Sequence, residues 1–98
     1  MKINKTTQDS TLMIALEGRL DTTTAPQLEA ELKQSIAGNT ELILDFTKLE
    51  YLSSAGLRVL LTAQKVMNKQ GKMVVRGVND VIAEVFEVTG FADILTIE

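Results

Sequence analysis

ELILDF, residues 41–46, is a nearly continuous apolar run of the kind found in strands that are buried on both faces. Such strands lie at the centre of parallel sheets that helices cover, so we expect this run to be the central strand. A short segment, Lys48-Leu49-Glu50, and then the pair Ser53-Ser54 follow it. Beyond the serines, the side chains of one helical face recur up to Gly71: Leu57, Leu60, Leu61, Gln64 and Met67. The run therefore predicts an α/β fold in which a central strand leads into a helix.

The residues before this strand predict a β-hairpin and a first helix. Ile3–Thr7 and Thr11–Leu16 are strand-like, and the polar turn Gln8–Ser10 between them has the length that joins antiparallel neighbours. Gly18 then breaks the strand pattern. Asp21–Pro26 opens a helix, with a hydroxyl cap close before the proline, whose missing N–H costs nothing in a first turn.

The residues after the second helix predict two more strands and a third helix. Gly71 is expected to end the second helix in a left-handed conformation, and Lys72–Val78 forms the next strand. Asn79-Asp80 caps a helix that closes at Thr89-Gly90. Ile94–Ile97 is expected to be a terminal strand. The predicted order of elements is therefore β-β-α-β-α-β-α-β.

This order predicts where a functional site lies. Helical crossovers between the second and fifth strands make these strands parallel, with connections that are almost always right-handed. The carboxyl ends of parallel strands share one edge of the sheet, where open α/β sheets usually meet ligands and partners. Three segments are expected to meet at that edge: Asp21–Thr24, Leu52–Gly56 and Gly77–Asp80.

Size and composition restrict the classes of function. The chain has 98 residues, of which 45% are hydrophobic, which suits one compact domain over residues 1–98. Its net charge of −3 gives no electrostatic reason to expect binding to nucleic acid or direct binding to a membrane. The chain also lacks an apolar run of signal-peptide or membrane-spanning length, which predicts a soluble, cytoplasmic protein.

Enzymatic activity is not expected. The sequence contains no histidine and no cysteine, which removes the commonest general base, the commonest zinc ligand and every thiolate site. It also has no glycine-rich motif of the phosphate-binding kinds. Asp21 and Ser54 can be imagined as a base and a nucleophile, but no side chain is placed to activate the serine. We therefore predict no catalytic residue, no metal site and no cofactor.

Ser54 has two possible roles. It lies at the predicted start of a helix, where unpaired backbone N–H groups amount to roughly half a positive charge. A phosphate on its hydroxyl would be stabilised there and would change the charge of a contact surface without refolding the domain. Gly56 would leave no side chain to obstruct that phosphate or a partner. From the residues alone, a plain N-cap is the commoner role of a serine here, and the same holds for Ser53.

Other residues of this edge also have alternative roles. Asp21 is either a carboxylate that faces a partner or an acidic residue that stabilises a helix N-terminus, and the second role is the commoner one. Leu57 is expected in the core rather than at a contact. Helical spacing places Arg58 on the solvent face.

Four motifs, in order, resemble the STAS domain, and in particular the small anti-sigma factor antagonists of bacterial partner-switching systems. Gly18–Asp21 resembles the family's G-x-L-D, and Ser53–Leu57 resembles its D-S-[ST]-G-L segment. Leu44–Leu52 resembles the central strand with its exit loop, and Val85–Phe91 resembles the late F-x-x-[ST]-G-[LF] signature. The resemblance covers essentially the whole chain. It implies a single STAS domain, with a mixed β-sheet packed against helices.

The resemblance implies a regulatory binding protein rather than an enzyme. Members of the family bind an anti-sigma factor that is also a serine kinase of the GHKL type, and so release the sigma factor. Phosphorylation of one serine abolishes that binding, and a PP2C-type phosphatase restores it. The phosphorylated serine corresponds to Ser54 and the partner-contact residue of the loop to Asp21. The expected partner surface comprises Asp21, Thr22, Ser53, Ser54, Gly56, Leu57 and Arg58.

The chain departs from the family pattern in three places. Ser53 replaces the usual aspartate before the phosphorylated serine, and Ala55 replaces the usual serine or threonine after it. The terminal helix that is common in the family is expected to be absent or very short. Ser53 and Ala55 keep one alternative open, a STAS module that is not phosphorylated and acts as a scaffold or ligand-binding subunit of a transport or lipid-trafficking assembly.

Overall fold

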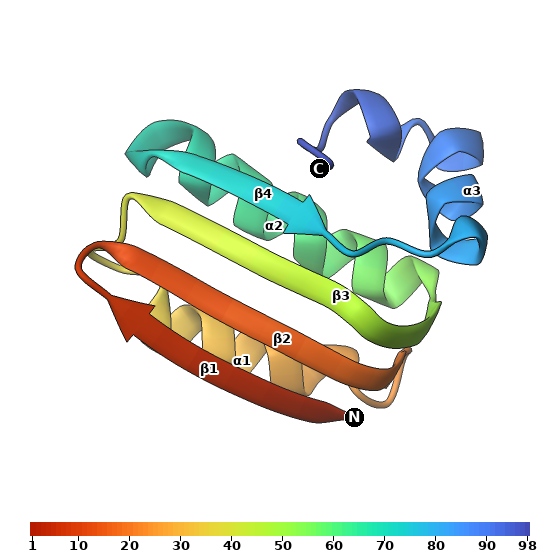
Figure 1. The fold of residues 1–98 in the computed structure, drawn as a ribbon, viewed down its shortest axis with the longest axis horizontal. Helices are drawn as coiled ribbons and strands as arrows, with labels where there is room; N and C mark the ends of the chain where they lie inside the picture. Colours follow the sequence, from red (N-terminus) through yellow and green to blue (C-terminus); the bar gives the residue numbers. More distant parts are fainter.

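A four-stranded mixed sheet organises the molecule (Figure 1). The computed structural model describes residues 1–98. The strands, in their spatial order, are β1 (Lys2–Gln8), β2 (Thr11–Leu20), β3 (Glu41–Leu52) and β4 (Lys72–Arg76). β1 runs antiparallel to β2, whereas β2, β3 and β4 run parallel to one another. The predicted α/β class, with a mixed sheet packed against helices, is confirmed.

Helices cover one face of this sheet. α1 (Ala25–Ser35) and α2 (Ser54–Gln70) lie behind the strands in Figure 1, while α3 (Asp80–Thr89) and the short 3-10 helix η1 (Phe91–Asp93) lie beyond β4. The core is a cluster of 22 buried residues from β2, β3, β4 and all three α-helices, with Leu95 near the C-terminus. None of the helices is long and apolar enough to cross a membrane.

The two faces of the sheet differ because side chains alternate along each strand. In β2, Leu12 and Ile14 are fully buried under the helices, while Met13 between them is only partly buried. Met13, Ile43 and Val74 are cross-strand partners on the face that α1 and α2 leave open. Ile43 is 8% exposed and lies outside the core cluster. The central strand is thus buried on both faces, but helices cover only one of them.

β3 is longer than the sequence predicts because it contains a bulge. Its pairing with β2 advances from Ala15–Asp45 to Glu17–Lys48, so β3 holds one extra residue. The backbone N–H of Thr47 points to Asp45, whose Oδ1 accepts it at 2.9 Å. A second register shift follows at Gly18, which lies inside β2 rather than ending it.

Two other local expectations are wrong. The predicted strand Ile94–Ile97 is reduced to one parallel bridge between Val75 and Ile97. The reason is that the N–H groups of Ile94 and Leu95 both bond to Phe91 O, so a helical turn takes up half of this segment. Gly71 is extended, with φ 172°, rather than left-handed. Glycine is needed there because a Cβ would collide with the Thr40 backbone.

Candidate functional site

The three segments predicted to share the carboxyl edge of the sheet are hydrogen-bonded to the strands that end there. Ser53 N donates to Leu20 O at 2.9 Å, which ties the start of α2 to the end of β2. Asn79 Nδ2 donates to Leu49 O at 3.0 Å, which ties the start of α3 to β3. The topology therefore brings the ends of β2, β3 and β4 together as expected.

Ser53, and not Ser54, is the N-cap of α2. Ser53 has extended backbone angles, and its Oγ accepts from Gly56 N at 3.4 Å. Ser54 is the first residue of the helix and is exposed, and its hydroxyl makes no hydrogen bond within the protein. The prediction that Ser54 is the N-cap of this helix is therefore wrong. Its free hydroxyl lies at the positive end of a 17-residue helix.

Asp21 organises the turn between β2 and α1. Its Oδ1 accepts from the backbone N–H groups of Thr23 at 3.0 Å and Thr24 at 3.2 Å. Thr24 Oγ1 in turn donates to Arg19 O at 2.8 Å, so the expected hydroxyl cap of α1 bonds to the preceding turn instead of the helix. Partial burial raises the pKa of Asp21, but the hydrogen bonds from Thr24 and Thr23 together outweigh it and lower the pKa below its ordinary value. Asp21 is thus a carboxylate at neutral pH.

Arg19 and Tyr51 are part of this edge, although the sequence pattern did not single out Arg19 as a site residue. They are cross-strand partners in β2 and β3, and the Arg19 guanidinium lies 4.1 Å from the centroid of the Tyr51 ring. Arg19 Nε is also 3.7 Å from Asp21 Oδ2. Tyr51 is 39% exposed, so the stacked pair faces solvent. The proximity of a basic and an aromatic residue depends on the strand register, which has no local signal in the sequence.

The remaining predicted contact residues divide into exposed and buried ones. Thr22 and Arg58 are exposed and line an open groove of about 170 Å³ between the starts of α1 and α2. Leu57 is only 7% exposed and belongs to the core, as its spacing indicated, which disagrees with its place in the expected partner surface. Gly56 is buried, and a Cβ there would lie 2.7 Å from Leu52 Cδ1 and 2.8 Å from Leu20 Cγ. Gly56 therefore makes room for the core rather than for a phosphate.

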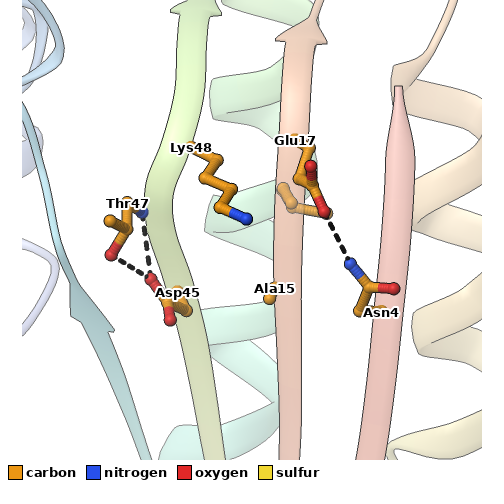
Figure 2. A pocket seen from close by; sticks show the side chains of 7 residues that line it. Asn4, Ala15, Glu17, Asp45, Thr47 and Lys48 are labelled. Atoms are coloured by element: carbon orange, nitrogen blue, oxygen red, sulfur yellow. Dashed lines mark hydrogen bonds between the residues drawn. The ribbon is translucent and has the colours of Figure 1, made fainter.

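A second depression lies on the open face of the sheet (Figure 2). It has a volume of about 260 Å³, and polar side chains surround the small Ala15: Asn4, Glu17, Asp45, Thr47 and Lys48. Both carboxylates are engaged, since Glu17 accepts from Asn4 and Asp45 from Thr47. Hydrogen bonds from Thr47 lower the pKa of Asp45, which makes it a weak base. This depression offers no activated nucleophile or base.

Comparison of the sequence with known proteins identifies its relatives. The sequence profile of the STAS domain matches residues 2–98. The chain is 38% identical to the putative anti-sigma factor antagonist BtrV of Bordetella bronchiseptica, over 99% of this chain and 85% of that protein. It is 31% identical to the anti-sigma-B factor antagonist of Staphylococcus aureus, over 97% of this chain and 90% of that protein.

Solved structures share the fold at lower sequence identity. An anti-sigma factor antagonist from Mycobacterium paratuberculosis superposes with a TM-score of 0.89 at 22% identity, covering 98% of this chain and 83% of the other. The Bacillus cell fate determinant SpoIIAA in its phosphorylated form gives 0.78 at 20% identity, covering 99% and 91%. A sulfate transporter family protein from Wolinella succinogenes also gives 0.78 at 20% identity, covering 93% and 75%. Identities this low relate the folds alone.

Proposed function

Because this chain belongs to the STAS domain family, we propose that it is an anti-sigma factor antagonist, a regulator that acts by binding a partner and not by catalysis. In its unphosphorylated form it binds an anti-sigma factor that is also a GHKL-type serine kinase, in the cytoplasm, and so releases a sigma factor or another target. Phosphorylation of Ser54 ends this binding, and a PP2C-type phosphatase reverses the modification. Two relatives above 30% identity with anti-sigma factor antagonist names support this class of function.

The phosphorylation proposal rests on the different roles of the two serines at the start of α2. Ser53 satisfies the Gly56 N–H, so the helix start does not require the Ser54 hydroxyl. Ser54 is exposed on the helix end, where backbone N–H groups stabilise an added phosphate. Ser54 can therefore be modified without the loss of a cap. The proposed partner interface also includes three residues of the same edge that are at least partly exposed: Asp21, Thr22 and Arg58.

The departures at positions 53 and 55 are compatible with this proposal. An aspartate at position 53 would cap α2 through a carboxylate oxygen, and Ser53 caps it through a hydroxyl. Ala55 is partly buried against the core, so a hydroxyl at that position is not needed for the helix start. The alternative of a transport subunit is supported only by the fold-level likeness to a sulfate transporter family protein.

The proposal is tested by incubating the protein with its cognate anti-sigma factor kinase and ATP and locating phosphate by mass spectrometry. We expect one phosphate, on Ser54, and none in Ser54→Ala. Ser54→Asp is expected to weaken binding to the anti-sigma factor by at least about tenfold, because a charge would replace a neutral contact. Binding is measured by isothermal titration calorimetry.

Two controls separate the site from the fold. Ser10→Asp adds the same charge to an exposed serine in the turn between β1 and β2, and it should leave affinity unchanged. Ser53→Ala should still be phosphorylated on Ser54. Phosphate on any other residue, or wild-type affinity in Ser54→Asp, would contradict the proposed role of Ser54.

A further inference from the structure

α3 exposes two valines beside the side chains that anchor it in the core. Ile82 and Phe86 anchor the helix and are fully buried. A second stripe beside this anchor consists of Val81, Val85 and Val88, spaced four and three residues apart. Its middle residue, Val85, is partly buried against the core, and the outer two are exposed. Val81 is 62% exposed and Val88 is 76% exposed, the two most exposed large hydrophobic residues of the chain. Since burial of Val81 and Val88 would be favourable, this stripe has the character of an unoccupied contact surface.

An acidic stripe runs along the same helix. Each valine of the stripe directly follows an acidic residue: Asp80, Glu84 or Glu87. None of these three carboxylates forms an ion pair within the protein. Like charges three and four residues apart repel each other, and Glu87 also lies in the last turn, where the helix dipole disfavours an anion. Asp80 is favoured by the dipole in the first turn of α3, but Glu84 and Glu87 have neither this effect nor a basic partner to offset their repulsion.

The acidity extends over the whole C-terminal part of the chain. Residues 77–98 contain no lysine or arginine and hold these acidic residues: Asp80, Glu84, Glu87, Asp93 and Glu98. Only Glu98 has a basic partner, Arg76 Nη2 at 3.8 Å. The field around the valine stripe is thus negative, although the rest of the chain carries an excess of basic residues.

We propose that α3 is a docking surface for a basic amphipathic helix of a partner protein. Apolar side chains of that helix cover Val81, Val85 and Val88, and its lysines or arginines pair with Asp80, Glu84 and Glu87. Helices that pack in this way use apolar residues at the same spacing, flanked by opposite charges. A second copy of this chain is a poor occupant, because it would bring two acidic stripes together.

This surface lies on a different helix from the proposed phosphorylation site, although both helices begin at the carboxyl edge of the sheet. α3 begins after Asn79, whose side chain is bonded to the end of β3, whereas Ser54 begins α2. The inference rests on the exposure and charge of α3 and does not depend on Ser54.

The test uses a synthetic peptide of about 18 residues, long enough for about five helical turns, with a leucine stripe flanked by lysines. Fluorescence anisotropy measures its affinity for the 98-residue protein, and ¹⁵N–¹H spectra map its site. We expect amide shifts concentrated in residues 80–88. The pair Val81→Ser and Val88→Ser should raise the Kd at least about tenfold. The pair Glu84→Lys and Glu87→Lys should do the same and should create binding to a peptide with glutamates in place of the lysines.

Matched controls use residues outside α3. Val66→Ser changes an exposed valine of α2, and Glu50→Lys reverses an exposed charge of β3. Both should leave the Kd within about twofold. Circular dichroism checks that each variant is folded. If the Val81→Ser and Val88→Ser protein is unfolded, the Kd of the Glu84→Lys and Glu87→Lys protein tests the proposal.

Four results would overturn the proposal. The first is no binding of the lysine peptide, and the second is a set of amide shifts centred outside α3. The third is an unchanged Kd in the α3 variants. The fourth is self-association of the wild type in sedimentation that the valine substitutions abolish, because a second copy would then be the occupant.

Discussion

Two neighbouring hydroxyls at the start of α2 have different surroundings. Ser53 turns its Oγ to the Gly56 N–H, while Ser54 leaves its own hydroxyl in solvent. One residue therefore stabilises the helix and the other is free to react. The local sequence does not distinguish them, because serine is a good cap residue at either position. A helix that starts one residue later would make Ser54 the cap instead of Ser53.

Stability measurements should separate these two roles. We expect Ser53→Ala to lower the free energy of unfolding by about 0.5–1 kcal/mol, the low end of the range for a lost cap, because the hydrogen bond is long at 3.4 Å. Ser54→Ala should change it by less than about 0.5 kcal/mol. Urea unfolding followed by circular dichroism measures both. A larger loss in Ser54→Ala than in Ser53→Ala would mean that Ser54 is the cap.

Gln64 is a buried polar residue on the apolar face of α2. It is 6% exposed, its Nε2 donates to Asn68 Oδ1 at 2.8 Å, and its Oε1 has no partner. Since an unpaired buried carbonyl is costly, we expect Gln64→Met to raise the free energy of unfolding by about 1 kcal/mol. Asn68→Ala, the control, removes the same hydrogen bond and should not be stabilising. A loss of stability in Gln64→Met would show that Oε1 is satisfied in solution.

At the scale of elements, the first turn of α2 is fitted closely to the end of the sheet. Gly56 lies against Leu20 of β2 and Leu52 of β3, the last residues of their strands. The absence of a side chain lets the helix approach both strand ends. That approach in turn holds Ser53 within hydrogen-bond distance of Leu20 O. The position of Ser54 at the edge thus depends on core packing behind it.

Gly56→Ala tests this fit. The new Cβ would lie within 2.8 Å of atoms of Leu20 and Leu52, and we expect a net loss of about 1–2 kcal/mol from overpacking, despite the better helix propensity of alanine. Urea unfolding measures the loss. Adding Leu52→Val, which removes the nearest atom, should recover part of it in a double-mutant cycle. A stabilised Gly56→Ala protein would mean that the helix start has room to move.

The bulge in β3 explains why the sequence underestimates this strand. Polar residues after Phe46 end the apolar pattern, so the prediction stops there. In the structure the strand continues to Leu52, because two extra residues, one at each register shift, keep Leu49 and Leu52 directed into the core. Asp45 supports the bulge through Thr47, whose N–H and hydroxyl both donate to Asp45 Oδ1. Periodicity alone cannot reveal such a change of register.

At the scale of the whole molecule, two carboxyl groups make stability depend on pH. Hydrogen bonds from Thr47 are the largest cause of the lowered pKa of Asp45, and those from Thr24 and Thr23 together lower the pKa of Asp21 against the effect of burial. A lowered pKa means that the unfolded chain binds the proton more tightly. Each group therefore adds stability above the ordinary carboxyl pKa of about 4, which is lost as the pH falls through the folded-state pKa.

We expect the protein to lose stability between about pH 6 and about pH 3, and Asp45→Asn to lose less over the same range. The difference arises because the asparagine cannot be protonated. Urea unfolding at both pH values measures the two losses. Asp93→Asn, which changes an exposed carboxylate of η1, is the control and should behave as the wild type does. An equal or greater loss of stability in Asp45→Asn would contradict the assignment of this pH dependence to Asp45.

Much of the architecture was predictable because its signals are local. Alternation marked the hairpin, helical spacing marked α2, and Asn79 and Gly90 have the cap conformations that their residue types favour. The order of strands and crossovers then placed the ends of β2, β3 and β4 on one edge without any knowledge of the packing. The family motifs follow the same elements, and so they indicated Ser54 and Asp21.

Other features depend on how distant elements meet. Two register shifts between β2 and β3 set Arg19 opposite Tyr51 and bring Ser53 to Leu20 O. The contact of α2 with those strand ends turns Gly56 inward and leaves Ser54 outside. Neither depends on the residue types of one segment, because each follows from the packing of side chains that lie far apart in the chain. The amino-acid pattern therefore sufficed for the fold and the edge, whereas packing assigned the cap to Ser53 and the free hydroxyl to Ser54.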